Sequence, residues 1–372
     1  MKRKLLSVLL TLAMALTLLP VSAMAEGETG TLQSQIATSG TVTLDKDYTE
    51  DITIPSGADV TLDLNGKTLS NTNNGKATLS VEGTAVVKNG TIIGGTGYYN
   101  IEVKKGGSLT LENVTATAGN TGSSMIDNWG TLTITSGVYT GGLNVVKSEE
   151  DSKLTINGGT FTLNYATNGY TGVIFAYGTT TITGGEFIQS LTSTGRWNHP
   201  QVVATGVVEG YTATTVVTGG TFTNKMSSEG IFRGVGKGTS DNFKVSGGTF
   251  NKSVPDAYFA DGYIAQKVDG VYTVVGPYEA KIGTTGYKTL ADAITAANES
   301  DSAKTITLLQ DVVVADQIVI NNTSSKTITL DLNKFTLTST YTLATTSSAA
   351  RYALVNNTPL TVKNGTFAAG EA

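Results

Sequence analysis

Two nearly identical stretches of nine residues lie far apart in this chain of 372 residues: TLDLNGKTL at 61–69 and TLDLNKFTL at 329–337. The similarity extends to both sides of each stretch, which indicates two copies of one module. The matching flanks are TLQSQIA at 31–37 with TLADAIT at 289–295, SGTVTLDKD at 39–47 with AKTITLLQD at 303–311, and VVKNGTI at 86–92 with TVKNGTF at 361–367. We expect a first module over residues 26–276 and a second, incomplete module over residues 277–372.

A shorter repeat runs through the first module. In each unit an alternating run is followed by a turn that contains Asn or Gly and then by a short apolar or aromatic stop. The stops are Leu69, Ile92, Ala116, Tyr139, Phe161, Phe187, Phe222 and Phe250. They are separated by 23, 24, 23, 22, 26, 35 and 28 residues. A period in the low twenties is too short for a propeller blade and matches one coil of a solenoid.

Each unit also carries an earlier apolar run that ends at a glycine, as in MIDNWG at 125–130 and GVIFAYG at 172–178. Each coil is therefore predicted to hold three short strands, with alternate residues facing inward. Equivalent strands of neighbouring coils would pair in parallel at about 4.8 Å. The predicted fold class is all-β: a parallel β-helix with three strands and 22–28 residues per coil. A leucine-rich horseshoe does not fit, because the helical half of each repeat is missing.

This fold predicts that like residues stack on one another inside the solenoid. The expected inward row is Leu62 or Leu64, Val87, Leu111, Ile134, Ile156, Ile182, Val217 and Val245. The exposed end of such a stack needs a cover, because its strand edge is unpaired. Leu290, Ile294 and Ala297 have helical spacing, so we expect a short amphipathic capping helix before the stretch at 329–337, and an equivalent helix in the first module.

The segment AKIGTTGYKTLADAITAA at 280–297 has the form AxIGxxxYxTLxxAIxxA and accompanies NGGTF-type coils. This combination resembles the pectin-lyase-like right-handed β-helix regions of Gram-positive bacterial surface proteins. The resemblance implies the right-handed form of the helix. It also implies where chemistry would lie, since polysaccharide lyases and hydrolases of this fold place clustered acids, often with Ca²⁺, and a basic residue on one outward strand row.

Residues 1–25 have the features of a secretory signal: a basic start, an apolar run over 5–19 and Ala23-Met24-Ala25. We therefore expect a mature protein that is extracellular, either secreted or attached to the cell wall, with no membrane span after cleavage. The second module stops abruptly, which favours a truncated chain. Because there is no cysteine, disulfides and thiolate metal sites are excluded. Removing the three basic residues of the signal changes the formal charge from −5 to −8, which argues against nucleic acid as a partner.

The outward row that the resemblance singles out has few candidates for catalysis. Its polar residues are Glu102, Lys104, Asp127, Asn128 and Arg233. Asp127 and Arg233 stand about four coils apart, roughly 20 Å at the strand spacing, which is too far for one active site. No two carboxylates in adjacent coils are expected to align, so we predict no catalytic residue and interpret these side chains as solvent-facing.

Two acidic runs offer oxygen ligands of the kind that Ca²⁺ prefers: DKDYTED at 45–51 and SEEDSK at 148–153. Neither has the spacing of an EF-hand loop. We predict no cofactor and interpret both runs as solvated turns, with calcium as the alternative.

The candidate binding residues are aromatic side chains with polar neighbours. The stretch TGRWNHPQ at 194–201 holds Arg196, Trp197 and the single histidine, His199. Such a loop can stack on a sugar and bind its hydroxyls, or its tryptophan can cover the solenoid wall. A lone histidine without a partnered Ser, Cys or acid does not by itself indicate catalysis. Trp129 and Tyr177 occupy equivalent positions and either extend the aromatic surface or cover turns.

These observations favour a non-catalytic adhesin, a secreted or cell-surface module that binds polysaccharide or components of a host or wall surface. The alternative is a polysaccharide lyase or glycoside hydrolase. A spacer that binds nothing is a third possibility.

Overall fold

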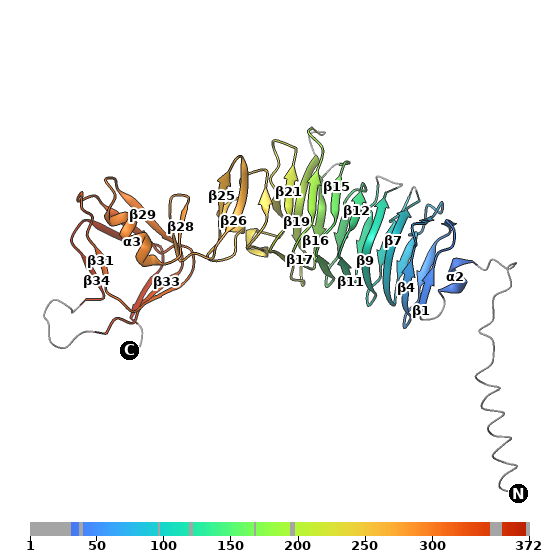
Figure 1. Cartoon of the computed structure of the whole chain (residues 1–372), viewed down its shortest axis with the longest axis horizontal. Coiled ribbons are helices and arrows are strands. Elements are labelled where there is room, and N and C mark those ends of the chain that lie inside the picture. The colour runs from blue at the N-terminus through green and yellow to red at the C-terminus, as the bar shows by residue number, and fades with distance from the viewer. Residues whose placement is uncertain are drawn as a thin grey trace, which may run out of the picture.

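The structure is a computed structural model that describes residues 31–36, 40–95, 97–118, 122–166, 169–193, 198–342 and 352–369. Over these residues the regular secondary structure consists almost entirely of short strands, and parallel pairing between coils stacks them into a β-solenoid. Figure 1 shows a long first stack followed by a shorter second one. The predicted all-β parallel β-helix is confirmed.

Each coil of the first module contributes one strand to an eight-stranded sheet and two strand segments to an 18-stranded sheet. The eight-stranded sheet consists of β3 (Ile52–Ile54), β6 (Leu79–Val81), β8 (Ile101–Val103), β10 (Ile126–Asn128), β13 (Val146–Ser148), β16 (Gly169–Ala176), β19 (Asn198–Val207) and β22 (Phe232–Gly236). The first segments of the larger sheet are β1 (Gly40–Thr43), β4 (Asp59–Asp63), β7 (Thr84–Ile93), β9 (Ser108–Thr117), β11 (Thr131–Ile134), β14 (Lys153–Ile156), β17 (Thr179–Ile182), β20 (Thr214–Val217) and β23 (Phe243–Val245). The second segments are β2 (Tyr48–Thr49), β5 (Thr68–Ser70), β12 (Gly137–Thr140), β15 (Thr160–Leu163), β18 (Glu186–Gln189), β21 (Thr221–Asn224) and β24 (Thr249–Phe250), with β7 and β9 continuing through both.

The predicted inward rows are confirmed by the strand register. Leu62 pairs with Val87, Val87 with Leu111, and the same row continues without interruption to Val245. Every member of this row has a relative exposure of 0%. Burial of a like residue on a like residue in each coil therefore supplies the hydrophobic core.

The aromatic stops form a second inward row. Their ring centroids are 4.9 Å apart between Tyr139 and Phe161, 5.0 Å between Phe161 and Phe187, and 4.9 Å between Phe187 and Phe222. Phe250 continues the row at 5.4 Å from Phe222. The first three pairs lie within 11° of parallel, because the strands that carry them are themselves in parallel register.

The repeated nine-residue stretch forms a hydrogen-bonded corner between coils. Oδ1 of Asp63 accepts hydrogen bonds from the backbone N–H of Asn65 at 2.9 Å and from Nδ2 of Asn89, one coil further on, at 3.2 Å. Asn65 and Asn89 have φ angles of 50° and 58°, which Asn adopts more readily than most residues. In the second module the same bonds join Asp331 to Asn333 and to Asn364, at 3.0 Å each.

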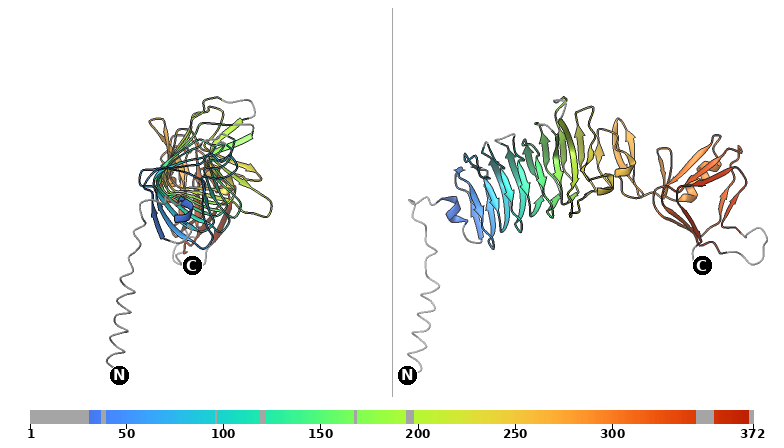
Figure 2. Two further views of the ribbon diagram at one scale, coloured as in Figure 1. Left: turned by 90° about the vertical axis from the view of Figure 1, so that its right-hand side faces the viewer. Right: turned by 180° about the vertical axis from the view of Figure 1, so that it is seen from behind.

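A short helix covers the start of each module, as expected. Helix α2 (Leu32–Gln35) has Thr31 as its N-cap, and Oε1 of Glu50 accepts the N–H of Leu32 at 2.8 Å. Helix α3 (Leu290–Asn298) has Thr289 as its N-cap, and Glu279 accepts the N–H of Leu290 at 2.7 Å. Figure 2 shows α2 at the free end of the first stack and α3 in the second. No helix among the described residues is both long enough and apolar enough to cross a bilayer.

The second module repeats the architecture around its own buried cluster. Its first sheet consists of β27 (Ala280–Ile282), β28 (Thr285–Tyr287), β29 (Lys304–Leu308), β32 (Ile328–Asp331) and β35 (Leu360–Lys363). The other two sheets consist of β30 (Val312–Val314), β33 (Thr336–Ser339) and β36 (Thr366–Ala369), and of β31 (Ile318–Ile320) and β34 (Leu354–Asn356).

An antiparallel hairpin that sequence reasoning missed covers the far end of the first module. It consists of β25 (Ile264–Val268) and β26 (Val271–Val275), and β26 pairs with β24 of the last coil. The short 3₁₀ helices η1 (Ser240–Asn242) and η2 (Asp256–Tyr258) precede it. The hairpin protects the last strand edge, as the helix protects the first.

The aromatic row makes a direct prediction about stability. Replacing Phe187, which is fully buried between two stacked rings, by Ala should lower the free energy of unfolding by about 3–5 kcal/mol. Val138, which is 46% exposed, provides the control, and Val138→Ala should change it by less than about 0.5 kcal/mol. Urea unfolding measures both, and equal effects would contradict an inward aromatic row.

Candidate functional site

The outward face of the eight-stranded sheet brings charged side chains from successive coils into one row. Glu102 of β8 pairs in register with Asp127 of β10, and Asp127 with Lys147 of β13. The row then continues through Phe175 and Ala204 to Arg233. Asp127 and Arg233 are therefore four coils apart, as predicted from the sequence.

The prediction that no two carboxylates align in adjacent coils is wrong, since Glu102 and Asp127 are register partners. The turn after β8 holds four residues, 104–107, whereas the turn after β10 holds only two, 129 and 130. Because the two turns differ in length, the spacing of the acids from the turn glycine does not reveal their register. The expectation that Asn128 faces outward is also wrong: it is fully buried on the inward face and donates to Oγ of Ser148 at 3.0 Å.

Three carboxylates gather on this face, and all are nearly buried: Glu102 is 7% exposed, Asp127 1% and Glu149 4%. The interpretation of Glu102 and Asp127 as solvent-facing is therefore wrong. Nζ of Lys104 lies 2.5 Å from Glu102, and the ammonium of Lys147 pairs with Glu149. Asp127 forms no ion pair with a cation among the residues that the structure describes. We call Glu102, Asp127, Glu149, Lys104 and Lys147 the carboxylate cluster.

Asp127 is the unusual member of the carboxylate cluster. Its Oδ2 accepts a hydrogen bond from Nε1 of Trp129 at 2.8 Å, but its buried Oδ1 has no partner among the described residues. Burial, followed by the charge of Glu149, raises the pKa of the Asp127 carboxyl from its ordinary 3.8 to about 7. Burial also raises the pKa of Tyr99 to about 12, and the charge of Asp127 adds to that effect.

Trp129 and Tyr177 do occupy equivalent positions, but they are not neighbours, because Glu149 holds that position in the coil between them. The Trp129 side chain lies at the surface, 40% exposed, with its indole N–H fixed by Asp127. Tyr177 instead packs against the ring of Phe175 at 5.3 Å. Of the two aromatic side chains, Trp129 is the more exposed.

A cavity of about 210 Å³ opens beside the carboxylate cluster. Its lining is mostly polar and includes Glu102, Lys104, Tyr98, Ser80 and Asp51. This lining supplies acceptors, donors and one aromatic ring within a single cavity.

A second cluster assembles around the single histidine, where β16 and β19 are longer than the other strands of their sheet. Nδ1 of His199 lies 2.9 Å from Oε1 of Glu229, and Nε2 of Gln201 donates to Oε2 of the same carboxylate. The guanidinium of Arg233 lies 3.5 Å from Oε2 and donates to the hydroxyl of Tyr170 at 2.9 Å. We call these five residues the histidine cluster.

Sequence reasoning identified His199 but missed its acid. Glu229 lies 30 residues further along the chain, and only the pairing of β19 with β22 brings the two together. Arg233 also stacks over the Tyr170 ring, with Cζ 4.5 Å from its centroid, so it belongs to this cluster and not to the carboxylate cluster. Arg196 and Trp197, the other predicted binding residues, lie outside the described residues.

Three carboxylates of the acidic run at 45–51 form hydrogen bonds or ion pairs within the fold. Asp45 accepts from the hydroxyl of Tyr48 at 2.9 Å, Asp47 accepts from the N–H of Thr68 at 2.7 Å, and Asp51 pairs with Lys76 at 2.8 Å. Within the described ranges, no group of three or more His, Asp or Glu side chains is arranged to hold a metal ion.

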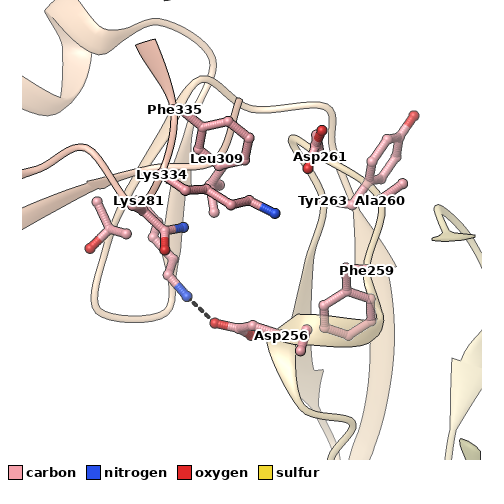
Figure 3. Close-up of a pocket in the computed structure, with 12 residues that line it drawn as sticks. Asp256, Phe259, Ala260, Asp261, Tyr263, Lys281, Leu309, Lys334 and Phe335 are labelled. Carbon is pink, nitrogen blue, oxygen red and sulfur yellow. Dashed lines mark hydrogen bonds and ion pairs between the residues drawn. The ribbon is translucent and has the colours of Figure 1, made fainter. Parts of the chain in front are cut away.

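A third site lies where the two modules meet. A cavity of about 330 Å³ is lined from the first module by Asp256, Phe259 and Asp261, and from the second by Lys281, Lys334 and Phe335, among others. Figure 3 shows the ion pair between Lys281 and Asp256 at its edge. The backbone joins the modules here too, with the N–H of Gly262 donating to the carbonyl of Leu309 at 2.6 Å.

Comparisons with protein-family models, with curated proteins and with solved structures found no match to this chain. The fold and these clusters define it as a β-solenoid protein with a charged and aromatic outward face on its smaller sheet.

The raised pKa of Asp127 predicts how stability depends on pH. Because the folded protein keeps a proton that the unfolded chain releases above its ordinary pKa of 3.8, stability should fall as the pH rises from there towards about 7. The expected slope is up to about 1.4 kcal/mol for each pH unit. Asp127→Asn should remove that slope, as measured by urea unfolding between pH 4 and pH 8.

The control is Glu186→Gln, which removes an exposed carboxylate and should leave the slope of the parent protein unchanged. An Asp127→Asn variant with the parent slope would contradict the proton on Asp127.

Proposed function

We propose that this protein is a secreted or cell-surface β-helix protein whose first module binds glycans without cleaving them. The observation that most supports this proposal is the contrast between the outward faces of the two sheets. The smaller sheet presents the carboxylate cluster, Trp129 and the polar cavity beside Glu102. The larger sheet presents a half-exposed row of threonines in register: Thr110, Thr133, Thr155 and Thr181.

The chemistry of the smaller sheet suits sugars. Ammonium groups donate hydrogen bonds to hydroxyls, and an indole ring stacks on the apolar face of a pyranose. Because Asp127 fixes the indole N–H of Trp129, the ring is held in position before a ligand arrives, which lowers the entropic cost of binding. The secretory features of residues 1–25 support export of the protein, and an exported surface meets glycans.

The pairing of the carboxylates supports binding over catalysis at this cluster. Glu102 and Glu149 are each neutralised by a lysine, and Asp127 is 1% exposed, so no carboxylate is free to act as an accessible acid or base.

A glycan array with the mature chain tests the proposal. We expect binding to a subset of polysaccharides, and a loss of at least about tenfold in affinity for Trp129→Ala, as for the truncation of a central aromatic anchor. Tyr211 is also 40% exposed, so Tyr211→Ala is the matched control and should bind normally. Silence across the array would contradict glycan binding and favour a spacer. Equal losses in both variants would place the site elsewhere.

The histidine cluster favours one alternative, a polysaccharide lyase or glycoside hydrolase. Glu229 accepts from His199 at Nδ1, which leaves Nε2 as a base, and Arg233 holds the hydroxyl of Tyr170 close by. The side chains of His199 and Arg233 are 36% and 40% exposed, and the residue Tyr170 is 39% exposed. A substrate can therefore reach all three.

The same polysaccharides therefore also serve as substrates in a cleavage assay, with and without Ca²⁺. New reducing ends or unsaturated products that disappear in His199→Ala would establish the enzyme and overturn the non-catalytic proposal. Binding without any product supports it.

A further inference from the structure

The two copies of the nine-residue stretch differ at only two positions. Gly66 and Lys67 of the first copy are replaced by Lys334 and Phe335 in the second. Both replacements line the cavity between the modules, which we call the junction cavity. The two positions at which the repeated stretch differs therefore both lie at this cavity.

Lys334 occupies a backbone conformation that a glycine would adopt more easily. Its φ is 72°, close to the 77° of Gly66 at the equivalent turn position. A Cβ added at Gly66 meets no heavy atom within 4 Å, so the turn has room for a side chain and only the left-handed backbone disfavours it. The geometry of the turn alone does not explain why a lysine, and not a glycine, occupies position 334. A strained residue of this kind points to a role for its side chain.

The junction cavity offers that role, because its lining carries charges of both signs. Figure 3 shows the Lys334 side chain extending from the second module into the space that Asp261 and Phe259 border on the other side. Lys334 and Asp261 are both exposed, and neither forms an ion pair with any residue in the described part of the chain. By contrast, the Lys281 ammonium is neutralised by Asp256.

Aromatic side chains share this lining, and the Lys334 ammonium lies 5.1 Å from the centroid of the Phe335 ring. Phe259 and Phe335 are each 9% exposed and line the cavity from opposite modules. A volume of about 330 Å³ falls at the lower end of the range for small-molecule sites, which occur preferentially between domains.

We propose that the junction cavity binds a small molecule that carries a carboxylate for Lys334, a hydrogen-bond donor for Asp261 and an apolar face for the aromatic rings of the lining. A single amino acid and an acidic monosaccharide both have this chemistry. The proposal concerns a different site from the glycan-binding face and does not depend on it.

Calorimetric titration of the mature chain tests it with three probes: phenylalanine, glucuronate and glucose. We expect phenylalanine or glucuronate to bind, which identifies the source, and glucose, which lacks a carboxylate, not to bind. Lys334→Gly should lower the affinity for that ligand at least tenfold. The same variant should raise the melting temperature of the second module by a few degrees, because glycine relieves the left-handed strain.

Two further variants separate charge from strain. Lys334→Gln keeps the strain but removes the charge, so it should lose binding without gaining stability. Gly66→Lys introduces the strain into the first module and should lower its melting temperature without affecting binding. Failure of both carboxylate probes, equal binding of glucose, or a lower melting temperature in Lys334→Gly would overturn the proposal, the last by showing that Lys334 holds the modules together.

Discussion

Parallel backbone pairing between successive coils is the constraint on which the rest of this structure depends. It places each residue directly against its equivalent one coil away, so a residue type that suits one coil must suit the whole row. The apolar row from Leu62 to Val245 and the stack from Tyr139 to Phe250 follow from that requirement. The corner built on Asp63 and Asn89 is its polar counterpart, since it ties one coil to the next through side chains.

The same pairing creates the functional surface. Glu102, Asp127 and Lys147 are remote in sequence and become neighbours only because three strands lie in register. Burial and then the charge of Glu149 raise the pKa of Asp127 to about 7, whereas Glu102 and Glu149 each pair with a lysine. Lys334 lies in a left-handed turn at the module junction, where the equivalent residue of the first module is a glycine. We connect this lysine to ligand binding.

The sequence predicted most of the fold and little of the candidate sites, for one physical reason. Inward positions recur with the period of the coil, so the spacing in the sequence predicts the rows through Ile134 and Phe161. The capping helix at Leu290 followed from helical spacing. Outward neighbours depend on turn lengths, which differ between β8 and β10, so the alignment of Glu102 with Asp127 was missed. The partnership of His199 with Glu229 depends on the pairing of β19 with β22, and no local pattern marks it.

Deletion of one complete coil tests the central claim most directly. Residues 153–178 span β14, β15 and β16, and Lys153 is the register partner of Thr179, so removing them joins equivalent points of the stack. The account predicts a chain that still unfolds cooperatively, with a β-type circular dichroism spectrum and a solenoid shorter by about 4.8 Å in small-angle scattering. A chain that no longer folds after this deletion would contradict a core built from interchangeable coils.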